Sequence, residues 1–483
     1  MHPLPIAAWA TALAVGLAPT PAAAAPIAAS SSMSAPVPTS QRLVSPGTGH
    51  TPDPALRGLS ATANARLGLW DSSRARAGQS ARPQLTRGMG VLVVSAKEAR
   101  TGEPVERFCA TILAAENLTE CTGSGALTIR GLPTGRALPV VVRPDGGRNL
   151  LADFVAPVIG AEQPTAAAAV FGLGGTIAAR VTDRRTGEVY ADDTSMLWIR
   201  TVSADSTWAF VGLTEGDDKG FIHSEPLPAG DYRIFVAMGP GGRLGSQWVG
   251  ANGGSGREHQ AATVTVGEDG ETVAPAVLLD PAGTVHGKVL HPDGSPVVSG
   301  IAGYESYRYN DQALLVDSIG ADGAFRSRNL GPYEWAIRFM PNAETESSTP
   351  DQWVGGTIRE RDATTVRVEP GVDKEQDFRL AAGTTLEGKV SGPTGDNAKR
   401  YALLVDAREG VVAGSYVTGT EPTYSYHVIG GSDIKIRAAT VENDDPLGFG
   451  WHDNAASFDE ATPIPVPASG KVTVDLRFPT TAR

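Results

Sequence analysis

The chain has 483 residues, which is too long for one hydrophobic core and enough for roughly three to five domains. Its 57 glycines and 35 prolines, with 6% aromatic residues, predict an all-β fold of short strands separated by turns. The formal net charge of -12 argues against a nucleic-acid partner, because a phosphate backbone needs a basic face.

The N-terminal region predicts export. Residues 5–19, PIAAWATALAVGLAP, form an apolar run too short to span a membrane, and the small residues of TPAAAAP follow it. We therefore expect a signal peptide over residues 1–25, cleaved within residues 22–25. This predicts a secreted, extracellular protein without a membrane span.

Residues 26–87 are rich in Ser, Pro, Ala and Arg and lack sustained apolar periodicity. Such a segment cannot bury enough apolar surface to offset the entropy of ordering it, so a disordered spacer is predicted. The alternative for residues 55–70, ALRGLSATANARLGLW, is a short amphipathic helix with Leu56, Leu59, Leu67 and Trp70 as its apolar points.

The two cysteines lie close together in RFCATILAAENLTECTG. If the strand around Cys109 turns near Ala115 and returns, Cys121 comes to lie opposite Cys109 in a cross-strand disulfide, as an oxidising compartment permits. The spacing excludes a CxxC redox pair. A structural disulfide is therefore predicted in the first folded segment.

An internal repeat occupies the rest of the chain. Alternating strands begin GGTIAARV, AGTVHGKV and TTLEGKV and end at Val181, Val289 and Val390, with a more divergent copy at MGVLVVSA. In each period a Gly turn and a strand lead to a turn such as LPAG or LGP. Further along come a tryptophan, in SQWVGAN, DQWVGGT and GFGWHDN, and a final alternating strand.

These repeats predict four antiparallel β-sandwiches. The expected boundaries are 88–173 for a divergent first sandwich with the disulfide, 174–281 for the second, 282–382 for the third and 383–483 for the fourth. The residues around the repeated tryptophan vary between copies, so we interpret Trp248, Trp353 and Trp451 as packing residues rather than as binding sites.

The order of a G-x-V strand, a DG-x-PV turn, a DG-x-F strand, LPAG-x-Y and a Trp-loop-strand resembles the carboxypeptidase regulatory-like domain. That domain is a prealbumin-like sandwich similar to the Cna B-type and SdrD B-like repeats of secreted bacterial proteins. The resemblance covers about residues 88–483. It implies a noncatalytic accessory or stalk module with a starch-binding-like topology.

Motifs for catalysis, metals and cofactors are weak. The eight histidines form no HExxH, no GxSxG is present, and GTTLEGKV carries Val390 where a P-loop needs Ser or Thr. Strand alternation predicts that Lys288 faces solvent rather than forming an isopeptide bond, with Lys389 and Arg180 at the matching positions. No catalytic residue, metal or cofactor is expected, although an acidic loop such as VENDDPLGFGWHDNAASFDEA offers oxygen ligands for Ca²⁺.

Two function classes remain. The first is an extracellular structural, adhesive or interaction rod whose partner, such as a cell-surface protein, is unknown. The second is a carbohydrate-binding protein with a polysaccharide partner, because Tyr307 and Tyr309 in one copy and Trp198 and Trp208 in another are aromatic side chains that can stack on a sugar ring.

Overall fold

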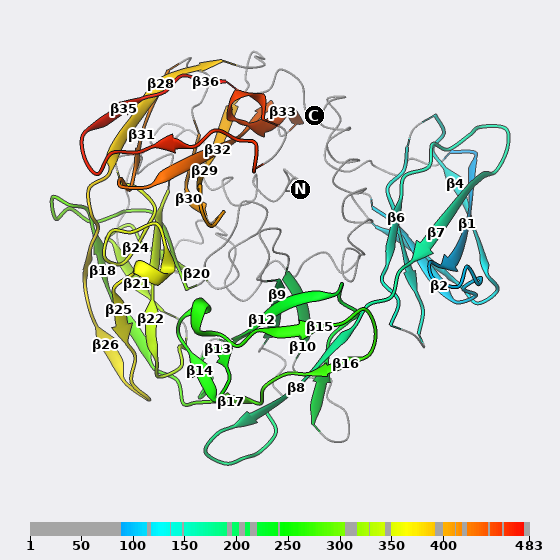
Figure 1. Ribbon diagram of the computed structural model, residues 1–483, viewed down its shortest axis with the longest axis horizontal. Helices are drawn as coiled ribbons and strands as arrows, with labels where there is room; N and C mark the ends of the chain where they lie inside the picture. The colour runs from blue at the N-terminus through cyan, green and yellow to red at the C-terminus, as the bar shows by residue number, and fades with distance from the viewer. Residues whose placement is uncertain are drawn as a thin grey trace, which may run out of the picture.

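The computed structural model describes residues 88–477 except for short gaps at 114–116, 136, 147–148, 191–195, 202–207, 213–219, 240–241, 305–315, 328, 343–348, 392–398, 411, 418–422, 443–444 and 456–457. In the described chain nearly all regular secondary structure is β-strand, apart from three one-turn 3₁₀ helices (Figure 1). This confirms the predicted fold class of tandem β-sandwiches. The expected signal peptide and spacer lie outside the described residues.

Sandwich 1 contains two sheets of three and four strands, in the orders β4-β1-β7 and β3-β2-β5-β6. Its strands are β1 (Gly90–Glu98), β2 (Phe108–Ile112), β3 (Leu118–Thr122), β4 (Ala126–Leu132), β5 (Val140–Pro144), β6 (Asp153–Val155) and β7 (Thr165–Phe171).

Sandwich 2 pairs a sheet around β8 with a larger sheet around β12. The first sheet contains β8 (Thr176–Asp183), β11 (Phe221–His223), β16 (Glu271–Val273) and β17 (Val277–Leu279). The second contains β9 (Met196–Thr201), β10 (Trp208–Gly212), β12 (Gly230–Ala237), β13 (Gln247–Gly250), β14 (Gly253–Ser255) and β15 (Val264–Val266), with the helix η2 (Glu258–Gln260) between β14 and β15.

Sandwich 3 repeats this plan around β18 and β23. The first sheet contains β18 (Thr284–Leu290), β21 (Ala324–Arg326), β26 (Asp373–Glu375) and β27 (Phe378–Arg379). Opposite it lie β19 (Gly300–Gly303), β20 (Val316–Ile319), β23 (Arg338–Pro341) and β24 (Gln352–Trp353), the pair β22 (Glu334–Ala336) and β25 (Thr365–Arg367), and the helix η3 (Glu360–Asp362).

Sandwich 4 has the same plan around β28 and β32. The first sheet contains β28 (Thr384–Ser391), β31 (Thr423–Val428), β35 (Lys471–Thr473) and β36 (Leu476–Arg477). The second contains β29 (Lys399–Asp406), β30 (Val412–Val417), β32 (Asp433–Glu442), β33 (Asp445–Trp451) and β34 (Ile464–Pro465). The helix η4 (His452–Asn454) lies between β33 and β34.

Each sandwich closes its smaller sheet by a parallel pairing. The first strand, β1, β8, β18 or β28, has an antiparallel neighbour on one side and a parallel neighbour from the end of the same sandwich on the other. The first strands alternate as predicted: in β18, Val285 and Val289 are fully buried while Lys288 is exposed. Backbone hydrogen bonds therefore connect the beginning of each sandwich to its end.

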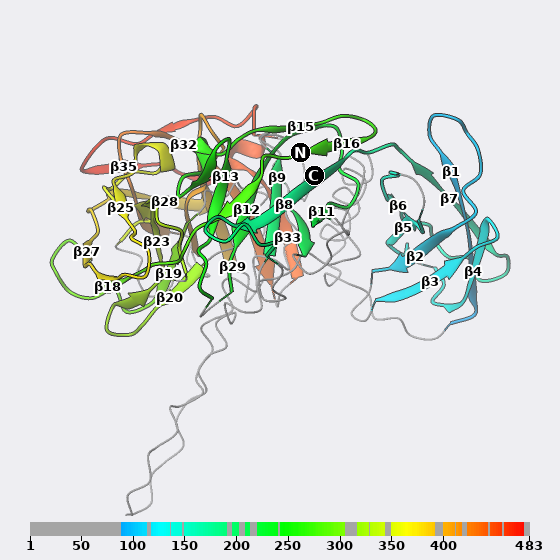
Figure 2. The same cartoon turned by 90° about the horizontal axis from the view of Figure 1, so that it is seen from below.

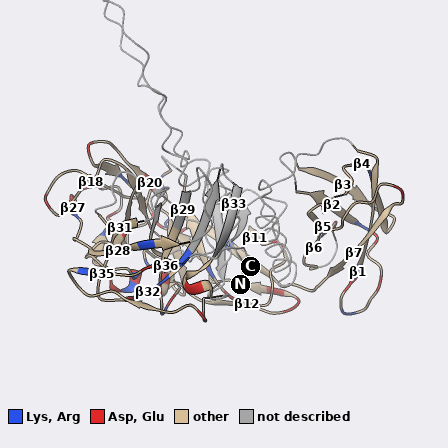
Figure 3. Cartoon of the chain, turned by 90° about the horizontal axis from the view of Figure 1, so that it is seen from above, with Lys and Arg blue, Asp and Glu red and all other residues tan. Residues whose placement is uncertain are grey.

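The sandwiches follow one another along a curved path. Figure 1 shows sandwiches 2, 3 and 4 as successive segments of an arc, with sandwich 1 set apart beyond β8. In Figure 2, seen from below, sandwich 3 lies to one side of sandwich 2, and the strands β29 and β33 of sandwich 4 overlap sandwich 2 in the view. Short acidic and basic segments are interspersed along the described ribbon (Figure 3). In the described part of the chain, no helix is long and apolar enough to cross a membrane.

Candidate functional site

The repeated tryptophans are buried packing residues. Trp248 and Trp353 are fully buried and Trp451 is 4% exposed, so none of the three presents a ring to solvent. Trp248 lies 4.9 Å from Phe235, measured between ring centroids. Both rings belong to a hydrophobic cluster that includes core residues of sandwich 3. Residues of sandwich 2 thus extend the core of its neighbour.

The glutamine before each of the first two tryptophans bonds to backbone near the end of its own sandwich, in β17 for Gln247 and in the linker for Gln352. Gln247 is fully buried, and its Nε2 donates to the carbonyl oxygen of Leu278 at 3.1 Å. Gln352 is 1% exposed; its Nε2 donates to the carbonyl of Ala381, and its Oε1 accepts from the Ala381 N–H at 2.8 Å. Both side-chain amides are thus buried with hydrogen-bonded partners, and losing these bonds would leave buried polar groups unsatisfied.

Asp280, in the linker between sandwiches 2 and 3, joins both sides. Its Oδ1 accepts a hydrogen bond from Arg184 Nε at 2.8 Å, and its Oδ2 lies 2.5 Å from the Tyr333 hydroxyl. That hydroxyl also lies 2.7 Å from Gln247 Oε1. Burial, followed by the hydrogen bond to Asp280, raises the pKa of the Tyr333 hydroxyl, which therefore stays a donor.

Backbone hydrogen bonds cross the same joint. The Ser246 N–H donates to the Asn329 carbonyl at 2.9 Å, and the Gly331 N–H donates to the Ser246 carbonyl at 2.8 Å. The contact is close because glycine stands where a side chain would collide: a Cβ on Gly256 would meet the Trp335 ring at 2.9 Å. The two sandwiches are therefore in direct backbone contact.

Ion pairs outside this backbone contact connect the one-turn helices η2 and η3. Arg257 Nε lies 3.0 Å from Glu360 Oε1, and Arg257 Nη2 donates to the carbonyls of Glu360 and Arg361. His259 Nδ1 lies 2.6 Å from Glu360 Oε2. Because the Glu360 side chain is 6% exposed, this ion pair is desolvated, and removing one partner would leave a buried charge.

The joint between sandwiches 3 and 4 uses the equivalent arginine. Arg359, which precedes η3 as Arg257 precedes η2, donates from Nη2 to Asp406 Oδ1 at 2.8 Å. The Asp406 side chain is fully buried, and its hydrogen bond raises the pKa of the Arg359 guanidinium. Ile358 packs in the core cluster of sandwich 4. Each of these two joints thus combines a buried apolar contact, a glutamine and an arginine.

Contacts between sandwiches 1 and 2 are more exposed. Arg143 Nη1 lies 3.0 Å from Glu225 Oε2, with side chains 30% and 40% exposed. An ion pair at this exposure contributes little to stability. A backbone hydrogen bond also lies at this boundary, from the Gly174 N–H to the Asn149 carbonyl at 2.8 Å.

The predicted disulfide is confirmed. Cys109 in β2 and Cys121 in β3 are directly opposite each other and bonded. Lys288, Lys389 and Arg180 are exposed, as strand alternation predicted.

Two of the four predicted sugar-stacking aromatics are placed only through their strands. Trp198 lies in β9, paired with Phe210 and Phe235, and Trp208 lies in β10, paired with Arg200. Tyr307 and Tyr309 fall outside the described residues. Binding by any of the four remains a prediction. Among the described residues, no three His, Cys, Asp or Glu side chains are grouped so that they could hold a metal ion.

The sequence does contain a pattern that marks the residues of the joints, although the sequence analysis did not use it. The dipeptide Gln-Trp occurs twice, and an Arg-Glu pair follows each copy, at Arg257 and at Arg359. The loop between the two motifs is longer in sandwich 2, where ANGGSG intervenes, so the Arg-Glu pairs do not align at one spacing. Only the fold shows that both arginines precede the same one-turn helix.

No protein-family profile and no curated protein matches the chain. Solved structures with similarity include a streptococcal ancillary pilin, 12% identical over 60% of this chain and 99% of that chain, with a TM-score of 0.18. Two B repeat units of the collagen-binding protein of Staphylococcus aureus are 9% identical over 81% of this chain and 100% of theirs, with a TM-score of 0.15.

The Bacillus anthracis TIE protein is 9% identical over 79% of this chain and 73% of its own, with a TM-score of 0.18. The B repeats of the collagen-binding protein are the Cna B-type repeats that the sequence resembles, whereas the name carboxypeptidase regulatory-like is not confirmed. TM-scores this low place the chain in none of these families.

Proposed function

We propose that the protein is a noncatalytic extracellular spacer in which sandwiches 2, 3 and 4 form one stiff, curved unit that holds its ends at a fixed separation. The cross-strand disulfide supports an oxidising, extracellular location, because such bonds persist outside the reducing cytosol. The partner at either end is a cell-surface protein or another extracellular molecule.

One observation carries this proposal. The joints after sandwich 2 and after sandwich 3 use the same parts: a buried Gln-Trp pair at the linker and an arginine that binds an acidic side chain. Domains connected only by polar linkers move relative to each other by default. A repeated joint of buried, bonded groups instead fixes the orientation of each sandwich to the next.

The distance between sandwiches 2 and 4 tests the proposal. Labels on Glu268→Cys and Ser469→Cys, in exposed turns of the two sandwiches, should give one narrow single-molecule energy-transfer distribution. Adding Arg257→Ala and Arg359→Ala should broaden it, since both joints lose an ion pair. The control Lys288→Ala, at an exposed position of sandwich 3, should leave it narrow. A distribution that is already broad in the parent chain would rule out a stiff spacer.

The alternative function, carbohydrate binding through Tyr307, Tyr309, Trp198 and Trp208, stays a prediction. A glycan array with the full chain and with the Tyr307→Ala/Tyr309→Ala variant tests it. Binding that the double substitution abolishes would support a carbohydrate-binding protein, and an array without binding would leave the spacer as the remaining proposal.

A further inference from the structure

The one-turn helices η2 and η3 lie in segments of nearly the same sequence. Residues 257–264 read REHQAATV, and residues 359–366 read RERDATTV. In both segments an arginine precedes the helix, and the second residue of the helix is His259 in η2 and Arg361 in η3. The two joints thus place different basic side chains at one equivalent position.

Each of these two side chains contacts an acid of the next sandwich. His259 Nδ1 lies 2.6 Å from Glu360 Oε2 of sandwich 3, and Arg361 Nε lies 3.2 Å from Glu409 Oε1 of sandwich 4. Arginine keeps its positive charge at all ordinary pH values, whereas histidine is the side chain that ordinarily changes its charge between pH 5 and 8. The two contacts therefore differ in their dependence on pH.

Glu360 is placed to respond to the charge of His259. The Glu360 side chain is 6% exposed and also pairs with Arg257 Nε at 3.0 Å, while the His259 side chain is 35% exposed and so exchanges protons with the solvent. A protonated His259 adds a charge-assisted hydrogen bond across the joint, and a neutral His259 leaves Glu360 with the charge of Arg257 alone. The contribution of the His259 charge is therefore present at low pH and is lost as the pH rises.

The remaining charged side chains of the two helices pair with groups other than His259. These pairs are Glu258 with Arg233 of β12 at 3.5 Å, Arg361 with Glu409 at 3.2 Å, and Asp362 with Arg359 at 3.9 Å. The change in charge of His259 therefore acts on Glu360 and, through Glu360, on Arg257.

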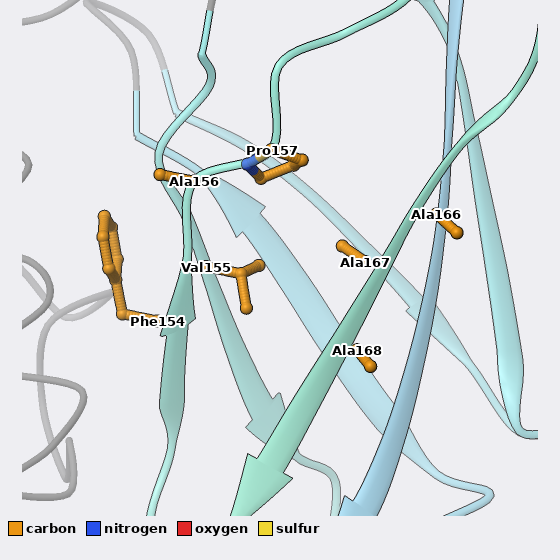
Figure 4. A pocket seen from close by; sticks show the side chains of 7 residues that line it. All are labelled: Phe154, Val155, Ala156, Pro157, Ala166, Ala167 and Ala168. Carbon is orange, nitrogen blue, oxygen red and sulfur yellow. The ribbon is translucent and has the colours of Figure 1, made fainter.

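Sandwich 1 offers no equivalent group, because residues 88–173 contain no histidine. Its apolar hollow of about 420 Å³, between β6 and β7, is lined by Phe154, Val155, Pro157 and four alanines (Figure 4). None of these side chains changes its charge with pH. A response to pH in this range is therefore expected at the joint between sandwiches 2 and 3 rather than at the hollow.

Another histidine of sandwich 2 provides a comparison within the same chain. His223 Nδ1 lies 2.7 Å from Glu271 Oε2, with side chains 40% and 44% exposed. Both residues belong to sandwich 2, so a change in the charge of His223 does not act across a joint. The pair of His259 and Glu360 differs because its two members belong to different sandwiches.

We propose that His259 makes the joint between sandwiches 2 and 3 sensitive to pH, so that this joint holds more tightly at pH 5 than at pH 8. The joint between sandwiches 3 and 4 keeps the equivalent ion pair at both pH values, because Arg361 stands in the place of His259. This rests on the proposed stiff spacer and names the condition under which one of its joints loosens.

Amide hydrogen exchange of the full chain at pH 5 and pH 8 tests the proposal. The N–H groups of Ser246 and Gly331 donate across this joint, and their protection factors, corrected for the intrinsic exchange rate at each pH, report its opening. The ratio of protection at pH 5 to protection at pH 8 should be about fivefold larger in the parent chain than in His259→Gln or His259→Arg, because a charge-assisted hydrogen bond is roughly twice as strong as a neutral one.

The two substitutions act in different ways. His259→Arg keeps a charge at both pH values and should retain at pH 8 the protection that the parent chain has at pH 5. His259→Gln stays neutral and should show the lower protection at both. Asp351 also titrates in this range, but it is present in every chain, so the difference between chains reports His259.

His223→Gln is the matched control and should show the same ratio as the parent chain. Thermal unfolding followed by circular dichroism checks that each variant folds. Equal ratios in the parent chain and in both folded His259 variants would overturn the proposed pH sensitivity and leave the stiff spacer intact. Exchange of Ser246 and Gly331 as fast as that of the exposed Ser469 at both pH values would instead contradict the stiff spacer, and the pH-sensitive joint with it.

Discussion

Trp353 shows how the repeated motif works at the scale of one residue. Its side chain is fully buried, in a small cluster with Ala336 and Ala363. The preceding Gln352 binds the linker that leads to sandwich 4. A binding ring would be exposed at least on one face, whereas this ring is enclosed within sandwich 3. The motif therefore marks a joint rather than a ligand site.

Replacing Trp353 with alanine should lower the free energy of unfolding by about 3–5 kcal/mol, the usual cost of emptying a buried aromatic site. Chemical denaturation followed by fluorescence of the other tryptophans measures this loss. Met89→Ala, at an 87% exposed position, should change stability little. A loss below about 1 kcal/mol for Trp353→Ala would contradict the packing role.

Asp351 makes the same region sensitive to pH. It is 4% exposed and lies 3.4 Å from Arg338 Nη2, and burial raises the pKa of its carboxyl from 3.8 to about 7 despite the guanidinium. The folded state therefore holds a proton that the unfolded state loses, so stability falls as pH rises from about 4 to about 7.

Denaturation at pH 5 and pH 8 tests this titration. The parent chain should be less stable at pH 8, and Asp351→Asn, which cannot titrate, should show a smaller difference between the two pH values. An unchanged difference in the variant would show that Asp351 does not titrate in this range.

At the scale of elements, the sequence predicted which segments form strands better than it predicted which strands pair with each other. Alternation correctly placed Val285 and Val289 in the core and Lys288 outside, and the cysteine spacing correctly predicted the β2–β3 pair. The parallel pairing of β7 with β1 could not be read, because alternation reports which face is buried but not the direction of a neighbouring strand.

The disulfide should stabilise sandwich 1 alone. Its loop of 12 residues corresponds to roughly 3 kcal/mol in the loop-entropy model. Cys109→Ser/Cys121→Ser should lower the calorimetric transition of sandwich 1 and leave the transition of sandwiches 2–4 in place. If the transitions of all four sandwiches shifted together, the disulfide would not stabilise sandwich 1 alone.

At the scale of the whole molecule, the repeat predicted the number and order of the sandwiches, while the boundaries at 174, 282 and 383 remain a proposal. The joints were beyond sequence reasoning because their partners come from distant positions: Arg257 meets Glu360, and Tyr333 meets Asp280. Successive sandwiches along the arc in Figure 1 meet through these contacts, which no local pattern encodes.

The central claim is that sandwiches 2, 3 and 4 are held in fixed orientation, and amide hydrogen exchange at the backbone bonds of the first joint tests it most directly. The N–H groups of Ser246 and Gly331 donate across the boundary between sandwiches 2 and 3. We predict that they exchange as slowly as core amides such as that of Ile234 in β12. Exchange as fast as that of the exposed Ser469 would contradict the claim.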